Sequence, residues 1–198
     1  CPLDHRPMTS LPLRATRRPR LLIVGCGDIG HRVLKLLGQR LTVRVLTRSA
    51  QHLPALRAAG ALPLHGDLDD ERTLGRLAAL ADWVLHLAPP PTHGDTDPRT
   101  RRLLRVLARG GTAKRIVYAS TSGVYGDCGG AHIDETRAPQ PATARAVRRV
   151  DAEGALRHHG RRTGASVSIL RIPGIYARDR PGGHPRERLA RGTPVLRA

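Results

Sequence analysis

The sequence contains no phenylalanine, and its one tryptophan and three tyrosines bring the aromatic content to only 2% of 198 residues. Leucine, valine, isoleucine and alanine must therefore form the core that an apolar content of 39% allows. The scarcity of aromatic side chains also argues against a row of stacking residues for single-stranded nucleic acid. Lysine is almost as scarce, because only Lys35 and Lys114 occur among the 34 basic residues.

Long apolar runs and paired cysteines are missing as well. No stretch approaches the roughly 18 continuous apolar residues of a membrane span, and the first twenty residues show no secretory signal. The three cysteines, Cys1, Cys26 and Cys128, are too widely spaced to predict a disulfide framework or a zinc site. We therefore expect a cytoplasmic protein with no membrane partner and no metal.

Basic residues outnumber acidic ones and leave a net charge of +18 at pH 7. Such a charge raises nucleic acid as a partner, with the basic segment 142–162 as the candidate surface. The arginines, however, are distributed over nearly every expected helix instead of forming a single stripe. We therefore expect no specific nucleic-acid partner, and a nucleic-acid binder stays the third of three functional hypotheses.

The most informative segment that is present is Arg20–Gly30, which has the sequence RLLIVGCGDIG. Its apolar run is typical of a buried parallel strand, and Gly25, Gly27 and Gly30 follow with G-x-G-x-x-G spacing before a stretch of helical periodicity. The glycines allow a tight turn, the approach of a pyrophosphate and close helix packing, and Asp28 favours the helix N-terminus. The motif predicts dinucleotide binding; a structural glycine-rich turn is the alternative.

Apolar runs that alternate with helical periodicity continue along the chain. The expected strands cover residues 21–24, 41–47, 61–65, 82–88, 114–119 and 166–172, and the expected helices after the glycine motif cover 50–59, 70–80, 98–109 and 142–159. This alternation predicts an α/β fold with a doubly wound parallel sheet. We expect a mobile segment at 1–19, a dinucleotide-binding domain at 20–177, and the start of a truncated substrate-binding lobe at 178–198.

Six segments directly follow the expected strands, where doubly wound sheets bind their ligands. They are 25–30, 47–48, 66–68, 87–91, 120–126 and 173–176. Because these segments meet at one edge of the sheet, they predict a cofactor cleft.

The end of the second strand predicts which cofactor the cleft takes. NAD-preferring sites usually carry an acidic residue there, but no Asp or Glu occurs between Asp28 and Asp67. Arg48 occupies the position instead and favours NADP(H) over NAD(H), because a guanidinium binds a 2′-phosphate. A merely solvated arginine is the alternative.

Five motifs resemble those of the extended and atypical short-chain dehydrogenase/reductase superfamily, in particular the NAD-dependent epimerase/dehydratase family. They are GCGDIG (25–30), HGDLDD (65–70), DWVLHLAPP (82–90), YASTSGVYGD (118–127) and LRIPGIYA (170–177), and the resemblance extends over residues 20–198. It implies a Rossmann-type domain, with Asp67 and Leu68 around the adenine and Thr121 hydrogen-bonded to the substrate oxygen. The cofactor-binding residues are then expected to be Gly25, Gly27, Asp28, Ile29, Gly30, Arg48, Asp67, Leu68, Leu87, Ala88, Pro89 and Arg149.

The chain departs from the family at the helix that follows these motifs. Family enzymes carry Y-x-x-x-K there, and alignment on Glu153 places Arg145 at the tyrosine and Arg149 at the lysine. Arg149 is suited to ribose hydroxyls or phosphate, but an arginine at 145 cannot shuttle protons near neutral pH. A solvated basic face is the alternative for both. Tyr125 is the candidate replacement acid or base, with Ser122 and His86 as further options.

The motifs and the departure together leave two main hypotheses. The first is an NAD(P)-dependent oxidoreductase that acts on a small-molecule substrate, with sugar nucleotides as one candidate class. The second is an NADP(H)-binding sensor or scaffold without catalysis. The resemblance favours the enzyme, and the missing tyrosine–lysine pair favours the sensor.

Overall fold

A computed structural model describes residues 18–37, 40–177, 179, 185–190 and 192. It contains a six-stranded parallel sheet in the order β3-β2-β1-β4-β5-β6, which confirms the expected doubly wound fold. The strands are β1 Arg20–Val24, β2 Thr42–Thr47, β3 Leu62–His65, β4 Trp83–His86, β5 Arg115–Thr121 and β6 Ser166–Ile172. The strand order reverses between β1 and β4, and this switch point is where the cleft is expected.

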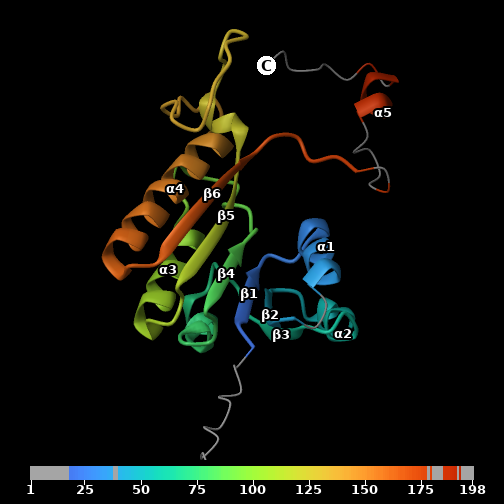
Figure 1. Ribbon diagram of the computed structural model, residues 1–198, viewed down its shortest axis with the longest axis vertical. Coiled ribbons are helices and arrows are strands. Elements are labelled where there is room, and N and C mark those ends of the chain that lie inside the picture. Colours follow the sequence, from blue (N-terminus) through green and yellow to red (C-terminus); the bar gives the residue numbers. More distant parts are fainter. Residues whose placement is uncertain (1–17, 38–39, 178, 180–184, 191, 193–198) are drawn as a thin grey trace, which may run out of the picture.

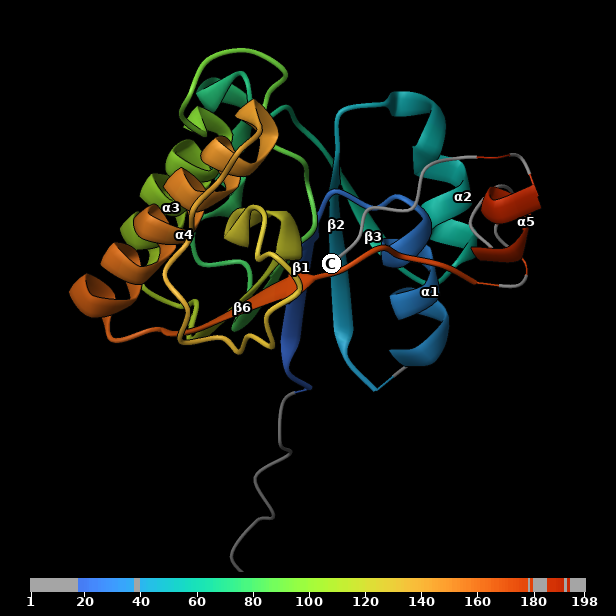
Figure 2. The ribbon, with the colours of Figure 1, turned by 90° about the horizontal axis from the view of Figure 1, so that it is seen from above.

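Helices cover both faces of the sheet (Figures 1 and 2). Helices α1 (Asp28–Leu37) and α2 (Leu53–Ala58) lie on one face, and α3 (Pro98–Gly110) and α4 (Ala144–Thr163) lie side by side on the other. Three short 3₁₀ segments, η1 Ala50–His52, η2 Glu71–Leu77 and η3 Ser122–Tyr125, and the short helix α5 Pro185–Ala190 complete the described elements.

The alternation of side chains along β1 divides the core into two clusters. Leu22 and Val24 belong to the cluster on the α3–α4 face, together with Leu103 of α3. Leu21 and Ile23 belong to the cluster on the α1–α2 face. Because both faces of the sheet are covered, β1 is apolar at every position after Arg20, as the sequence predicted.

The long helices begin and end at capping residues. Asp97 caps α3 by accepting a hydrogen bond from the backbone N–H of Thr100, and Pro98 occupies the first turn. Gly111 ends the helix in the left-handed conformation, at φ 62°. Thr143 caps α4 in the same way as Asp97 caps α3. The start predicted for α3 is therefore confirmed, whereas α4 begins two residues later than residue 142.

The helix expected at 70–80 is shorter in the structure and is a 3₁₀ helix. The structure has a 3₁₀ helix at Glu71–Leu77, which ends before Ala79 at φ 60°. Leu74 and Leu77 are fully buried and three residues apart, a spacing that suits the 3.0 residues per turn of a 3₁₀ helix better than an α-helix. The strand expected at 82–88 is also shorter, because the N–H groups of both Leu87 and Ala88 donate to the carbonyl of Val24.

The expectations for the two ends of the chain lie largely outside the described residues. Positions 1–17 of the N-terminal segment and most of 178–198 are not described. No described helix is both long enough and apolar enough to cross a bilayer.

Candidate functional site

The three glycines of the loop between β1 and α1 meet different surroundings. Gly25 has a φ of +85°, and a Cβ there would lie 2.6 Å from the backbone of Ala88. A Cβ on Gly30 would lie 2.7 Å from the Sγ of Cys26, so this glycine packs against its own loop. A Cβ on Gly27 would meet nothing within 4 Å. The first and third glycines therefore shape the loop, and the second leaves open space beside the N-terminus of α1.

A cleft of about 470 Å³ opens at this loop. Its lining includes eight of the predicted cofactor-binding residues, namely Gly25, Gly27, Arg48, Asp67, Leu68, Leu87, Ala88 and Pro89. The remaining lining residues are Val24, Cys26, Leu46, Thr47, Ser49, His52, Gly66 and Arg99. The structure thus brings together the ends of β1, β2, β3 and β4, as expected for a ligand site at the switch point.

Arg48 lies exposed at the rim of the cleft, directly after β2. Its carbonyl oxygen lies 3.1 Å from the Nε2 of His65, and the next residue, Ser49, donates its N–H to the Oγ1 of Thr47. These bonds hold the backbone on either side of the side chain. Asp67 is the only acidic side chain among the described lining residues, which also include the arginines Arg48 and Arg99.

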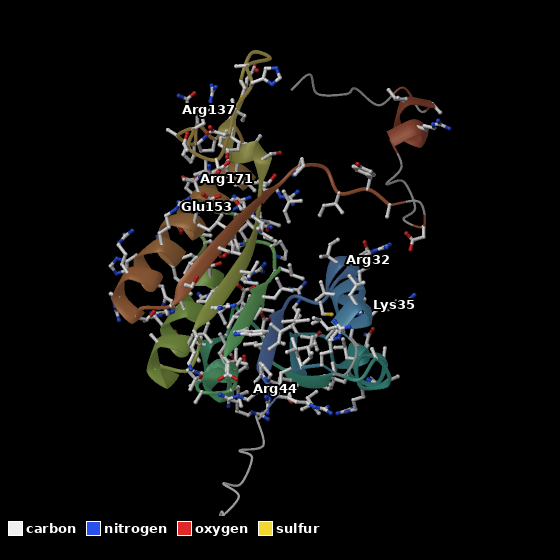
Figure 3. The ribbon with its side chains drawn as sticks, in the orientation of Figure 1. Arg32, Lys35, Arg44, Arg137, Glu153 and Arg171 are labelled. Atoms are coloured by element: carbon white, nitrogen blue, oxygen red, sulfur yellow. The ribbon has the colours of Figure 1, made fainter. Side chains whose placement is uncertain are left out.

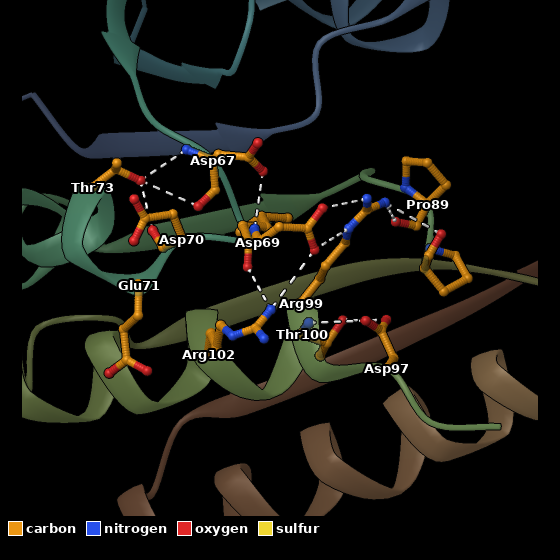
Figure 4. Close-up of polar contacts among 12 residues, drawn as sticks. Asp67, Asp69, Asp70, Glu71, Thr73, Pro89, Asp97, Arg99, Thr100 and Arg102 are labelled. Carbon is orange, nitrogen blue, oxygen red and sulfur yellow. Dashed lines mark hydrogen bonds and ion pairs between the residues drawn. The ribbon is translucent and has the colours of Figure 1, made fainter. Parts of the chain in front are cut away.

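Arg99, at the start of α3, ties two cleft loops together (Figure 4). Its guanidinium donates two hydrogen bonds to the carboxylate of Asp69, at 2.9 and 2.6 Å. It also donates to the carbonyl oxygens of Pro89 and Pro90. The guanidinium holds the pKa of Asp69 below its ordinary value. Sequence reasoning missed Arg99; its place after Pro98, at the N-terminus of an expected helix near the sheet edge, was the available signal.

Asp67 uses its carboxylate within its own loop. Oδ1 accepts the N–H of Asp69 at 2.9 Å, and the N–H of Asp67 donates to the Oγ1 of Thr73 (Figure 4). The loop therefore presents a fixed wall to the cleft.

Three further predicted cofactor residues, Asp28, Ile29 and Gly30, form the first turn of α1 and do not line the cleft. The carboxylate of Asp28 pairs with Arg32 at 3.0 Å, and its position in the first turn also favours the helix dipole. The backbone of this first helical turn, and not its side chains, lies next to the open space at Gly27.

Thr121 and Tyr125 lie in a second group of residues, at the end of β5 and in η3. The Oγ1 of Thr121 accepts the N–H of Gly123 at 3.2 Å, and the side chain is half-buried. Tyr125 is buried, and the Arg171 guanidinium lies 4.7 Å from the centroid of its ring. Neither residue lines the cleft in the described part of the chain.

A buried carboxylate organises this second group (Figure 3). Glu153 is fully buried and accepts hydrogen bonds from Ser120 at 2.6 Å, Arg171 at 2.9 Å and Arg157 at 3.1 Å. Burial alone would raise the pKa of Glu153, but the bonds from Arg171 and Ser120 leave it below its ordinary value. Glu153 thus links α4, β5 and β6. The sequence singled out Glu153 only through alignment, and nothing in it indicated Arg171 as the partner.

Arg149 is buried and turned toward β5. Its Nη1 donates to the Oη of Tyr118 at 2.9 Å and to the carbonyl oxygen of Ala119 at 2.6 Å. Burial raises the pKa of Tyr118 to about 12, although the charge of Arg149 opposes the shift. Arg145 is exposed, and Arg148 is buried with a bond to the carbonyl of Gly94. A wholly solvated basic face is therefore wrong for this part of α4.

His86 lies fully buried at the end of β4, between the two groups. Its Nε2 lies 2.8 Å from the Oγ1 of Thr100, which donates its own proton to Asp97. Thr100 can then only accept from the ring, which places the ring proton on Nε2. Burial, helped by the charge of Arg149, lowers the pKa of His86 to about 3. A neutral, sealed imidazole cannot reach a substrate, so His86 is a core residue.

Among the residues placed by the structure, no group of three or more His, Cys, Asp or Glu side chains could hold a metal ion.

The sheet order, the glycine loop and the cleft define a dinucleotide-binding protein of the Rossmann type. Residues 25–196 match the model of the NAD(P)H-binding family, and the chain belongs to that family. Its cofactor is therefore a nicotinamide dinucleotide.

Known relatives extend this assignment. The 4-hydroxy-2-methyl-3-oxo-4-farnesyl-3,4-dihydroquinoline-1-oxide ketoreductase of Stigmatella aurantiaca is 31% identical over 111 residues, or 52% of this chain and 33% of the relative. The UDP-glucuronic acid 4-epimerase of Bacillus cereus, solved with NAD, superimposes with a TM-score of 0.66 at 22% identity, over 82% of this chain and 60% of the epimerase. The UDP-glucose 4-epimerase of Thermus thermophilus, also with NAD, gives 0.68 at 26% identity, over 89% and 64%.

The chain thus has the fold of the NAD-dependent epimerases and related short-chain dehydrogenases. It spans a third of the curated relative and less than two thirds of each of these two structures.

Proposed function

We propose that the chain binds NADP(H) in preference to NAD(H). We further propose that it acts as an oxidoreductase that reduces or oxidises a small molecule. The observation that carries the preference is Arg48, which lies exposed at the rim, where the second strand ends. The one acidic residue in the described lining, Asp67, has an oxygen engaged by the N–H of Asp69. A 2′-phosphate would therefore meet a guanidinium, whereas a 2′-hydroxyl would lack its usual carboxylate partner at the end of β2.

The residues present fit such a cofactor. The open space at Gly27 would take the pyrophosphate, and the first turn of α1 offers N–H donors and a positive dipole there. Asp67 and Leu68 would border the adenine, and the segment 87–89 would border the path toward the nicotinamide. Arg99 would hold the loops on both sides of the cofactor at a fixed separation.

When bound, the cofactor supplies or accepts a hydride. Thr121 would orient the substrate: its Oγ1 accepts from Gly123, so its own hydroxyl proton remains available to a substrate carbonyl oxygen. A donor of this kind suits carbonyl reduction, the activity in the name of the Stigmatella relative. Arg145 stays protonated near neutral pH, so the proton that accompanies the hydride must come from another group or from solvent.

Calorimetric titration of NADPH and NADH tests the preference. Replacing Arg48 by Ala should weaken NADPH binding by about 10- to 150-fold, the loss expected for a charge-assisted phosphate contact worth about 1.5–3 kcal/mol. NADH binding should change little. Arg57→Ala is the matched control, because Arg57 is an exposed arginine of the neighbouring helix α2 outside the cleft lining. Equal affinity of the wild type for both cofactors would refute the proposal.

One observation favours a second candidate, an NADP(H)-binding sensor without catalysis. Arg149 occupies the position of the family lysine. Its guanidinium donates hydrogen bonds to Tyr118 and to the carbonyl oxygen of Ala119, and Arg149 does not line the cleft. A screen of NADPH oxidation across ketones and nucleotide sugars separates the candidates. Tight NADPH binding with no turnover above the uncatalysed rate would support the sensor, and turnover would support the oxidoreductase.

A further inference from the structure

The loop that follows β2 lines the cofactor cleft with three polar side chains. Arg48, Ser49 and His52 all belong to the cleft lining. None of the three side chains makes a hydrogen bond or an ion pair with another described residue. The function proposed above uses only Arg48, so the roles of Ser49 and His52 remain to be explained.

The backbone of this loop is held by its own hydrogen bonds. The N–H of Ser49 donates to the Oγ1 of Thr47 at 3.3 Å, and the Nε2 of His65 lies 3.1 Å from the carbonyl oxygen of Arg48. The N–H of His52 donates to the carbonyl oxygen of Ser49 at 3.2 Å and closes the turn of η1. Side chains three residues apart eclipse each other in a 3₁₀ turn, so Ser49 and His52 face the cleft together.

The charged and titratable groups near His52 come from the elements that adjoin the loop. They are Arg48 of the same loop, Arg57 of α2, His65 of β3, Asp67 of the loop after β3 and Arg99 of α3. Arg99 is paired with the carboxylate of Asp69, and one carboxylate oxygen of Asp67 accepts the N–H of Asp69. Arg48 is therefore the arginine of the cleft lining that has no ion pair among the described residues.

We propose that Ser49 and His52 complete, with Arg48, the site for the 2′-phosphate, and that His52 makes the choice between NADP(H) and NAD(H) depend on pH. This inference rests on the NADP(H) preference proposed above. The hydroxyl of Ser49 and a protonated His52 ring would donate to phosphate oxygens that the guanidinium leaves unbound. NAD(H) carries no such phosphate, so its affinity should depend little on either residue.

The sign of the pH dependence follows from the charge of the ring. A histidine changes its charge between about pH 5 and 8, and a phosphate beside it stabilises the protonated form. A bound 2′-phosphate therefore gains more from His52 at pH 6 than at pH 8. The phosphate itself loses charge near pH 6, which acts in the opposite direction. The contribution of His52 is accordingly the ratio of affinities between the wild type and a variant at each pH.

Calorimetric titration of the whole chain with NADP⁺ and NAD⁺, at pH 6 and pH 8, tests the proposal. His52→Gln should weaken NADP⁺ binding about three- to tenfold at pH 6 and less than about twofold at pH 8. Its NAD⁺ affinity should change less than about twofold at either pH. Ser49→Ala should weaken NADP⁺ binding about two- to fivefold at both pH values, because a hydroxyl does not titrate in this range.

Two further variants sharpen the test. His52→Lys keeps a positive charge at both pH values, so it should bind NADP⁺ at pH 8 at least about twofold more tightly than the wild type does. His158→Gln is the matched control, because His158 is an exposed histidine of α4 outside the cleft lining. This variant should bind both cofactors as the wild type does. His52 is exposed and its ring has no partner among the described residues, so its variants should fold normally.

The possible failures are distinguishable. An equal loss of NADP⁺ and NAD⁺ affinity in His52→Gln would indicate contact with the shared adenine and overturn the inference. An equal loss of NADP⁺ affinity at pH 6 and pH 8 would exclude the proton. Unchanged NADP⁺ binding in His52→Gln, in a protein whose preference still depends on Arg48, would overturn this inference alone. Equal affinities of the wild type for both cofactors at both pH values would overturn the proposed preference as well.

Discussion

At the scale of single residues, two glycines of one loop have different physical roles. Gly27 adopts no positive φ, and its missing side chain faces open space. Gly27 is also the residue before α1, and its carbonyl accepts the N–H of His31, so a valine there should lower the free energy of unfolding by only about 1 kcal/mol. It should nevertheless weaken binding of both NADPH and NADH by at least about 100-fold, because the side chain fills the path of the pyrophosphate. Titration calorimetry and urea unfolding check the two halves of this prediction.

Gly25→Ala is the contrasting variant. A Cβ at this position is opposed by both the positive φ and the backbone of Ala88 at 2.6 Å. The substitution should therefore lower the stability of the fold by at least about 2 kcal/mol. If Gly25→Ala were as stable as the wild type, or Gly27→Val bound cofactor normally, this division of roles would be wrong.

The buried His86 predicts a pH dependence of stability. Its pKa is about 3 in the fold and about 6.5 in an unfolded chain. As the pH falls below 6.5, the unfolded chain binds a proton that the folded chain refuses, so the free energy of unfolding falls by about 1.4 kcal/mol per pH unit. Urea unfolding between pH 6.5 and 5 should show about 2 kcal/mol less loss in His86→Gln than in the wild type. Parallel pH profiles would contradict this prediction.

Some of these residues were predictable and others were not. The glycine spacing and the strand ends predicted most of the cleft lining, because backbone geometry at the ends of parallel strands depends on local sequence. Arg99 and Arg171 were not predictable as hydrogen-bond partners. Arginines are so abundant in this chain that composition cannot separate a buried, bonded guanidinium from a solvated one.

At the scale of elements, Arg99 joins the loop after β3 to the loop after β4. Arg99→Leu should free both loops and weaken NADPH binding about three- to tenfold. It should lower stability by no more than about 1 kcal/mol, since the ion pair with Asp69 is partly exposed. Arg105→Leu is the control, because Arg105 also joins α3 to η2, through Glu71, but lies away from the cleft. Equal affinities of the two variants would show that the loops need no such link.

The elements themselves were largely predictable from apolar periodicity. Strand β6 has the predicted bounds of 166–172, and α3 differs by one residue at its end. The helix predicted at 70–80 forms only at Glu71–Leu77, and it is a 3₁₀ helix because the three-residue spacing of Leu74 and Leu77 suits three residues per turn. The extension of β5 to Thr121 depends on its pairing with Ile172 of β6, which local sequence does not encode.

At the scale of the whole molecule, the α/β alternation and the glycine loop were sufficient to predict the layers, the parallel sheet and the position of the cleft. The packing of α3 against α4 was not predictable, because the residues that meet there are separated by more than forty residues of sequence.

The structure of the whole chain determined with NADPH tests the central claim most directly. The account predicts the pyrophosphate beside Gly27 at the N-terminus of α1 and the 2′-phosphate within hydrogen-bonding distance of the Arg48 guanidinium. A dinucleotide bound outside the cleft, or one in the cleft with its 2′-phosphate directed away from Arg48, would contradict it.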